Sequence, residues 1–194
     1  MARREPGRAE YQRDLSVSLH KLGDLYTALG RGPEALDAFQ QGFRIAQDLA
    51  NKEPGRADYQ RDLSVSLHKL GDLYTALGRD AEALDAFQQD LRIAQALALR
   101  EPGRADYQRD LSVSLHKLGD LYTALGRGPE ALDAFQQGFR IAQDLASKEP
   151  GRADYQRDLF VSLNKLGDLY KALGRGPEAL DAFQQGFRIA QDLA

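Results

Sequence analysis

The chain has 194 residues and a formal net charge of −3, and its 42% hydrophobic and 28% charged residues are typical of a folded, soluble protein. The slightly acidic balance argues against nucleic acid and anionic membranes as partners, because both require a basic surface. The absence of cysteine excludes disulfides and thiolate metal sites. No apolar run approaches the roughly 18–20 residues that span a bilayer. The start of the chain lacks the apolar segment of a signal peptide, so a cytoplasmic location is expected.

One sequence unit recurs through the whole chain. The motif "EPGRA" begins at Glu5, Glu53, Glu101 and Glu149, so the unit is 48 residues long. We expect a leader over residues 1–4 and one domain over residues 5–194. The expected repeats are residues 5–52, 53–100, 101–148 and 149–194. The pattern leaves open whether recent duplication or deliberate idealisation made these repeats so alike.

The first half of each unit has the apolar spacing of an amphipathic helix. In the first unit, apolar side chains recur every three or four residues from Tyr11 to Leu29. Gly30 follows, and glycine readily adopts the left-handed conformation that ends many helices. The sequence therefore predicts a helix that ends at Gly30, and equivalent helices in the other three units.

The second half of each unit predicts another helix, which begins near Pro33 in the first unit. In the second unit Asp80 replaces Gly32, and its carboxylate is expected to cap this helix. Apolar residues recur until Ala50, and the proline and glycine that follow Glu53 favour a turn. The chain should thus be all-α, with eight helices in four tandem antiparallel helix-turn-helix repeats. Since one helix pair cannot bury both apolar faces, the pairs should stack as an α-solenoid.

A short motif in each unit resembles the tetratricopeptide repeat. In the first unit it reads Leu19-x-x-Leu22-Gly23-x-x-Tyr26, followed by Ala35-x-x-x-Phe39. The small side chains of Gly23 and Ala35 allow two helices to approach closely, and Leu22, Tyr26 and Phe39 would fill the space around that contact.

The resemblance covers nearly the whole chain, although this unit is longer than the usual length of about 34 residues. The family's early tryptophan is replaced by Leu19 and its closing proline by Gln47. The resemblance implies a right-handed superhelix whose first helices line a concave groove. It also implies a non-enzymatic scaffold that binds a peptide or protein segment in that groove.

Ser16, His20 and Asp24 lie on one stripe of the first helix and have the composition of a catalytic relay. Nothing nearby indicates an oxyanion hole or an enclosed substrate pocket, so a solvated helix face is the better interpretation. Copies of His20 and Asp24 in successive units should lie too far apart to share a metal ion. We therefore expect no catalytic residue, no metal and no cofactor.

The helix pole opposite the apolar stripe is expected to line the groove. In the first unit this pole also carries Val17 and Thr27. The expected groove residues are His20, Lys21, Asp24, His68, Lys69, Asp72, His116, Lys117, Asp120, Phe160, Asn164, Lys165, Asp168 and Lys171. In the fourth unit Phe160, Asn164 and Lys171 replace serine, histidine and threonine. These changes fit either a tuned binding surface or drift where packing permits it.

The carboxyl end of the repeat array suggests a second kind of partner. Phe183, Phe187 and Ile189 lie on a helix face that a following helix pair would cover in each earlier unit. We expect this end to self-associate, either head-to-tail or by two-fold pairing. The alternative function is accordingly a structural or self-assembling array, natural or engineered, with no evolved ligand.

Overall fold

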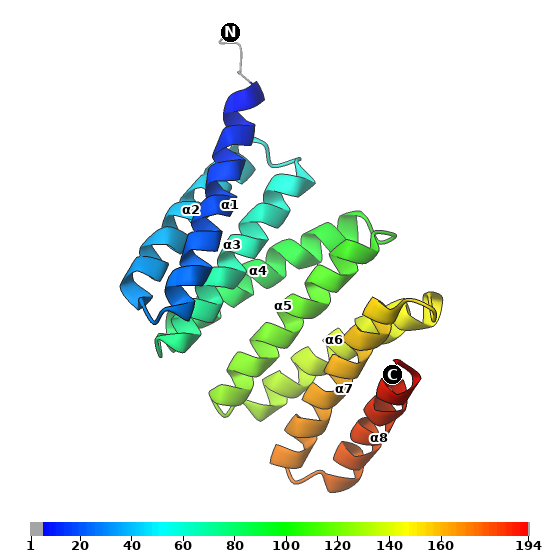
Figure 1. Cartoon of the computed structure of the whole chain (residues 1–194). Helices are drawn as coiled ribbons and strands as arrows, with labels where there is room; N and C mark the ends of the chain where they lie inside the picture. The colour runs from blue at the N-terminus through cyan, green and yellow to red at the C-terminus, as the bar shows by residue number, and fades with distance from the viewer. Residues whose placement is uncertain (1–5, 194) are drawn as a thin grey trace. The chain divides into compact units, whose positions relative to one another are not determined.

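The structure, a computed structural model, describes residues 6–193, and these form eight α-helices and no strand (Figure 1). The helices are α1 (Pro6–Ala28), α2 (Gly32–Lys52), α3 (Ala57–Ala76), α4 (Asp80–Arg100), α5 (Ala105–Ala124), α6 (Gly128–Lys148), α7 (Ala153–Ala172) and α8 (Gly176–Leu193). The predicted all-α architecture of helix-turn-helix repeats is confirmed. The chain divides into two compact units, Met1–Leu97 and Ala98–Ala194.

Glycine ends the first helix of each repeat, as the sequence predicted. Gly30, Gly78, Gly126 and Gly174 have φ angles of 70°, 68°, 68° and 71°, in the left-handed region that disfavours larger residues. After Gly30, the amide of Arg31 donates a hydrogen bond of 2.8 Å to the carbonyl of Tyr26. This bond closes the last turn of α1 and directs the chain into α2.

The second helix of the first repeat begins at Gly32, so that Pro33 lies just inside it, as the sequence predicted. Helix α4 starts at Asp80 itself, so the predicted capping role of Asp80 is wrong. Its carboxylate instead lies in the first turn of α4, where negative charge interacts favourably with the helix dipole. The residue before α2, Arg31, makes no side-chain cap; its guanidinium donates to the Glu34 carboxylate at 2.8 Å.

The two helices of a repeat touch where a glycine of the first faces a phenylalanine of the second. A Cβ atom on Gly119 would lie 2.5 Å from Cε1 of Phe135, and one on Gly71 would lie 2.6 Å from Cε1 of Phe87. Real Cβ atoms do not approach carbon so closely, so each position requires glycine. The predicted close approach of the paired helices is confirmed.

Within each compact unit, the second helix of one repeat packs against the first helix of the next. Apolar clusters join α2 to α3 in the first unit and α6 to α7 in the second. In the α2–α3 contact the buried residues are Ala35, Phe39, Ala46, Leu49 and Ala50 of α2 with Tyr59, Leu63, Leu67, Leu70 and Leu73 of α3. This packing covers the apolar stripes of α3 and α7 with the preceding repeat, as expected for stacked helix pairs.

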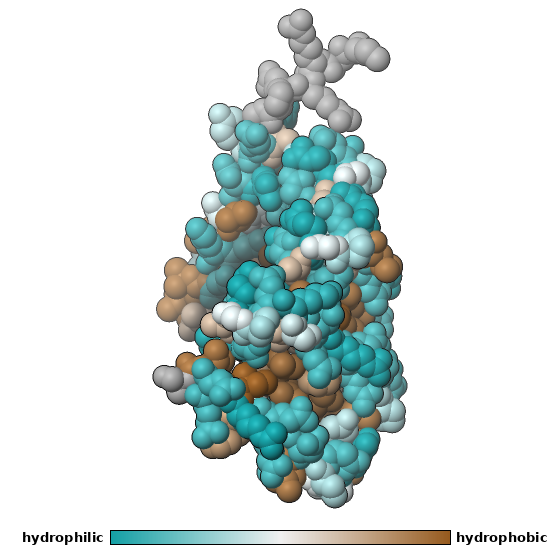
Figure 2. Space-filling model, turned by 90° about the vertical axis from the view of Figure 1, so that its right-hand side faces the viewer, coloured by the Kyte–Doolittle hydropathy of each residue, from teal (hydrophilic) through white to brown (hydrophobic). Residues whose placement is uncertain are grey.

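Helix α3 packs one of its faces against α2. The equivalent face of α1 has none of the described helices packed against it. Leu22 is therefore exposed, whereas its counterpart Leu70 is buried. The expectation that Leu22 fills the space beside Gly23 is wrong for the first repeat. Figure 2 views the molecule from the side on which α8 lies in Figure 1, and hydrophobic side chains gather in its lower part.

Candidate functional site

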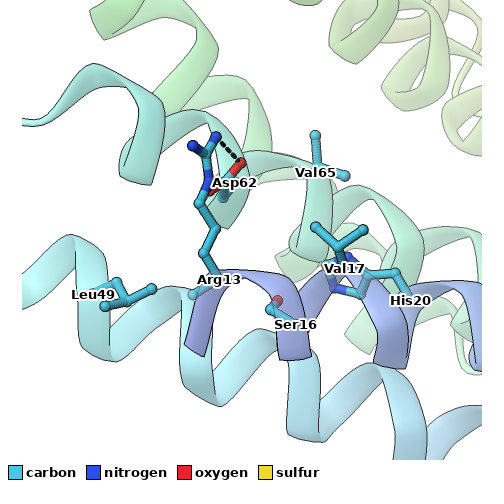
Figure 3. Close-up of a pocket in the computed structure, with 8 residues that line it drawn as sticks. Arg13, Ser16, Val17, His20, Leu49, Asp62 and Val65 are labelled. Carbon is cyan, nitrogen blue, oxygen red and sulfur yellow. Dashed lines mark hydrogen bonds and ion pairs between the residues drawn. The ribbon is translucent and has the colours of Figure 1, made fainter. Parts of the chain in front are cut away.

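The first helices of neighbouring repeats form a small pocket in each compact unit. We call α1, α3, α5 and α7 the A helices. The α1–α3 pocket is lined by Arg13, Ser16, Val17, His20, Ala46, Leu49, Asp62 and Val65 (Figure 3). The α5–α7 pocket is lined by the equivalent residues Arg109, Ser112, Val113, His116, Ala142, Leu145, Asp158 and Val161.

An ion pair between two A helices borders each pocket. Arg13 Nη2 donates to Asp62 Oδ1 at 3.1 Å, and its Nε donates to the other carboxylate oxygen (Figure 3). In the second unit Arg109 Nε donates to Asp158 Oδ2 at 2.6 Å. These pairs are partly solvated, so each contributes little to stability, but together they neutralise the charge beside the pocket.

The rim of each pocket is apolar. Val17 and Val65 are both exposed beside the first pocket, and Val113 and Val161 are exposed beside the second. Figure 3 shows the valines of α1 and α3 among the residues that line the first pocket with His20. The prediction placed Val17 on the open pole of its helix, and the structure exposes it there.

The expectation that His20 lines an open groove is wrong. Only 9% of the residue is exposed, and its ring packs over Gly42, where an added Cβ would lie 2.8 Å from Nε2. Nε2 also lies 3.0 Å from the hydroxyl of Ser66 on α3. His116 is 8% exposed and packs in the same way in the second unit. These two rings form the inner wall of a pocket and do not project from an open surface.

Burial keeps these two imidazoles neutral. It lowers the pKa of His116 to about 4, with a smaller contribution from the charge of Lys165. The pKa of His20 is lowered for the same reasons, first burial and then Lys69. The Ser66 hydroxyl also donates to the Asp62 carbonyl at 2.9 Å, so the Nε2–H tautomer of His20 satisfies both contacts.

The serine, histidine and aspartate of the first A helix do not form a relay. The Ser16 hydroxyl donates to the Gly42 carbonyl at 3.0 Å, while His20 contacts Ser66. Asp24 accepts bonds of 2.7 and 2.9 Å from Nζ of Lys69. Because each side chain bonds to a different neighbour, no proton path runs from serine through histidine to aspartate.

Two of the predicted lysines are paired with aspartates of the preceding repeat. Lys69 pairs with Asp24, and Lys165 donates to both carboxylate oxygens of Asp120 at 2.7 Å. Within residues 6–193, Lys21 makes no ion pair. Within each compact unit, the charges of the paired lysine and aspartate cancel across the two A helices. The other predicted charged positions are placed as follows: Asp72 lies 3.5 Å from Nε2 of His68, Lys117 is half-buried, and Asp168 and Lys171 are exposed.

The second repeat departs from this arrangement because Asp90 stands where the first and third repeats have glycine. Asp90 is 2% exposed, and it accepts a hydrogen bond from the Ser64 hydroxyl. His68 lies to the side, with Nδ1 3.6 Å from Asp90 Oδ2 and more of its side chain exposed. The hydroxyl donates directly to the carboxylate and not to the imidazole, so this cluster does not activate a serine nucleophile.

The fourth repeat turns two of its three substituted residues, Phe160 and Asn164, inward. A Cβ on Gly186 would lie 3.6 Å from both Phe160 Cδ2 and Asn164 Oδ1, so these two side chains pack toward α8. Both are half-buried. The predicted placement of Phe160 and Asn164 on an open groove therefore requires correction.

The three residues predicted at the carboxyl end are placed differently from one another. Phe187 is 62% exposed. Phe183 is half-buried, because its ring packs over Gly167 within the same repeat. Ile189 is half-buried, as are its counterparts Ile45 and Ile141 in earlier repeats.

Sequence reasoning missed the parts of the pockets that come from other helices. Asp62 and Leu49 reach the α1–α3 pocket from α3 and α2, and no spacing within one helix indicates this. It also missed the arginine after each turn, whose guanidinium lies over a tyrosine ring, as Arg31 does at 4.8 Å from the centroid of Tyr26. The repeat period was the one signal in the sequence that could have indicated these ion pairs, since Arg13 and Asp62 recur as Arg109 and Asp158.

Residues 6–193 contain no group of three histidine, aspartate or glutamate side chains arranged to hold a metal ion. Among the helices of this described part, none has the length and apolar character required to cross a membrane.

Family models for the tetratricopeptide repeat match residues 14–96, 111–149 and 160–193. The chain is a tetratricopeptide-repeat protein. The helical hairpins and the glycine–phenylalanine contacts described above lie within these matched repeats. Membership of this family, which is generally non-enzymatic, supports a role in protein–protein interaction.

No curated protein sequence matches this tetratricopeptide-repeat chain. Among solved structures it is similar to BtubC from P. vanneervenii, with 19% identity and a TM-score of 0.72 over 92% of this chain and 64% of that one. It is also similar to aspartyl phosphate phosphatase F from Bacillus subtilis, with 13% identity and a TM-score of 0.72 over 93% and 41%. A candidate kinesin light chain from Podosopora anserina, with nearly identical TPR-like repeats, gives 22% identity and a TM-score of 0.55 over 93% and 97%. The chain thus spans less than two thirds of the first two structures, and these similarities support the fold alone.

Proposed function

We propose that this chain is a non-enzymatic scaffold that binds a segment of a partner protein along its A helices. Small aliphatic side chains of the partner would enter the α1–α3 and α5–α7 pockets. The observation that carries this proposal is the recurrence of one pocket, lined by the same residue types, in both compact units. A pocket with the same lining in each unit suits a partner segment that offers a small apolar side chain to it.

The size and lining of the pockets favour small apolar groups. The space inside is about 30 Å³ in the first pocket and about 90 Å³ in the second, which suits groups from a methyl to an isopropyl. The exposed pair Val17 and Val65 supplies apolar contact at the mouth, worth about 25 cal/mol for each Å² removed from water. The Ser16 hydroxyl and Nε2 of His20 are already bonded within the fold, so they do not require a polar ligand.

The charges beside the pockets do not favour a carboxylate-terminated peptide. Lys69 and Lys165, which could bind a carboxylate, each hold an aspartate of the preceding A helix. A ligand carboxylate would have to displace that aspartate and leave it without its partner. The surface is therefore better suited to a partner segment whose side chains are small and aliphatic.

Selection of peptides by phage display would test this proposal. A random dodecapeptide library is selected on the wild-type chain and counter-selected on a variant carrying Val17→Glu, Val65→Glu, Val113→Glu and Val161→Glu. All four valines are exposed, so the fold should persist, and far-ultraviolet circular dichroism checks that it does. We expect enriched peptides to carry spaced valine, leucine or isoleucine residues.

The matched control is Leu99→Glu, which makes the same apolar-to-acidic change at an exposed residue that lines neither pocket. Selected peptides should bind this control as tightly as wild type, and the valine variant at least about tenfold more weakly, since buried contacts of this kind are each worth about 1 kcal/mol or more. Equal binding to the valine variant, or no enrichment on wild type, would rule the proposed site out.

A further inference from the structure

Helix α8 exposes a face that is covered in the earlier repeats. Leu193 is 43% exposed, whereas its counterpart Leu49 in α2 is 4% exposed. Ala190 is exposed where Ala46 is buried, and Phe187 is far more open than the half-buried Phe43. We call Leu180, Phe187, Ala190 and Leu193 the α8 face.

Helix α1 exposes the opposite half of the same contact. Tyr11 is 75% exposed and its counterpart Tyr59 is 4% exposed. Leu25 is 55% exposed and its counterpart Leu73 is 3% exposed. We call Tyr11, Leu15, Leu22 and Leu25 the α1 face. Their counterparts in α3 pack against α2, and three of the four counterparts in α7 are equally well buried.

These two faces are complementary because the chain already contains the contact between their counterparts, once in each compact unit. Helix α2 packs against α3, and α6 packs against α7, through residues equivalent to the two faces. We propose that a second copy of this chain binds head-to-tail, with the α8 face of one copy on the α1 face of the next. The contact would have the register of α6 on α7.

The charged residues support the same register. Arg13 bonds to Asp62, and Arg109 bonds to Asp158, always 49 residues further along the repeats. Continuing this series past α8 and into a second copy pairs Arg157 with Asp14 of that copy. Within the described residues neither Arg157 nor Asp14 makes a side-chain ion pair.

A second series runs with the opposite polarity. Asp24 pairs with Lys69, and Asp120 pairs with Lys165. Its continuation pairs Asp168 with Lys21 of a second copy, and both are exposed. Arg157 and Asp168 of α7 would thus meet residues of opposite charge on α1 of the second copy, namely Asp14 and Lys21. The charges are therefore complementary in this one register only. A two-fold pairing of two α8 faces would leave the charges of α1 without partners.

Head-to-tail binding uses different faces on the two copies, so each pair keeps one free face at either end. Further copies can therefore add to a pair as the concentration rises, whereas a two-fold dimer leaves no free face. None of the residues of the α8 face or the α1 face lines the α1–α3 or the α5–α7 pocket. A failure of self-association in a variant of either face would therefore leave the proposed peptide site untouched.

Light scattering after size exclusion measures this directly on the 194-residue chain. We expect the mean mass of the wild type to rise with loading concentration. Phe187→Glu blocks the α8 face and Leu25→Glu blocks the α1 face, so each variant alone should be monomeric. A glutamate opposite an apolar pocket should weaken the contact by at least about 30-fold. Both positions are exposed, and circular dichroism verifies that each variant is folded.

Mixing the two variants separates head-to-tail binding from other arrangements. Phe187→Glu retains an intact α1 face and Leu25→Glu retains an intact α8 face, so the mixture should form a dimer of one copy of each and grow no further. A two-fold pairing of α8 faces predicts instead that Leu25→Glu alone dimerises. Monomeric mass of the wild type at every concentration, or growth that neither variant prevents, would overturn the proposal.

Charge reversal tests the register. Arg157→Asp should shorten the chains of copies, and adding Asp14→Arg in the same polypeptide should restore them, since the pair is then re-formed with its polarity reversed. Restoration by the second change requires Arg157 of one copy to meet residue 14 of another. Failure of the double variant to recover would overturn the proposed register.

Discussion

Mild acid is expected to destabilise the folded chain through its two buried imidazoles. Burial lowers the pKa of His116 to about 4, and it lowers the pKa of His20 in the same direction. In an unfolded chain the pKa of histidine is about 6.5. Between these values the unfolded state binds more protons than the folded state, so the free energy of unfolding falls as the pH falls from about 6.5 toward 4.

The magnitude follows from the difference between the two pKa values. For His116 the full effect is about 3 kcal/mol, and about 2 kcal/mol of it is already present at pH 5. His20 adds to this loss. The relevant window is pH 7.5 to 5, because most carboxylates stay ionised above pH 5 and contribute little to the change.

Two measurements test this reasoning. Nuclear magnetic resonance follows the titration of each imidazole, and urea unfolding at pH 7.5, 6.5, 5.5 and 5.0 follows stability. The double variant His20→Asn, His116→Asn removes both buried rings, and asparagine already occupies this position in the fourth repeat as Asn164. His68→Asn is the matched control, because it leaves His20 and His116 in place and should keep the acid response of the wild type.

We expect the unfolding midpoint of the wild type and of the His68 control to fall clearly between pH 7.5 and 5.0, while that of the double variant changes little. Titration of His116 near pH 6.5 in the folded chain would refute the argument. An equal acid response in the double variant would refute it as well.

Two further predictions concern single positions. Gly119→Ala should cost roughly 1–3 kcal/mol in thermal or urea unfolding, because the new Cβ would overlap the buried ring of Phe135; Gly103→Ala, with open space around it, is the control and should be near neutral. Asp90→Gly should leave stability unchanged or raise it by about 1 kcal/mol, because it removes a buried carboxylate oxygen that has no hydrogen-bond partner among the described residues. A crystal structure of that variant should show the His68 ring over residue 90, and an unmoved ring or a large loss of stability would contradict the explanation.

The helices and their ends were predictable because they depend on neighbours in the sequence. The spacing of apolar residues placed the helices, and Gly30 ended the first of them in the left-handed conformation that only glycine adopts readily. The repeat period made one prediction valid for all four units. Even the contact of Gly23 with Phe39 was anticipated, because the two residues belong to one motif.

The candidate site was only partly predictable, and His20 shows why. The sequence argument divided the A helix into a buried pole and an open pole. In the fold, α1 also contacts α2 and α3, so His20 is enclosed between Gly42 and Ser66. Its burial depends on two other helices, one of them from another repeat.

The amino-acid sequence by itself determined the repeat, the helices and the residues that hold each pair together, since these rest on periodicity and on the conformational preferences of glycine and proline. Only the tertiary structure decided which polar side chains face solvent. Lys69 is the plainest case: its helix position indicates an open surface, but Asp24 of the neighbouring A helix holds its ammonium at 2.7 Å. Such contacts arise from the distance between stacked repeats, which no pattern within one helix encodes.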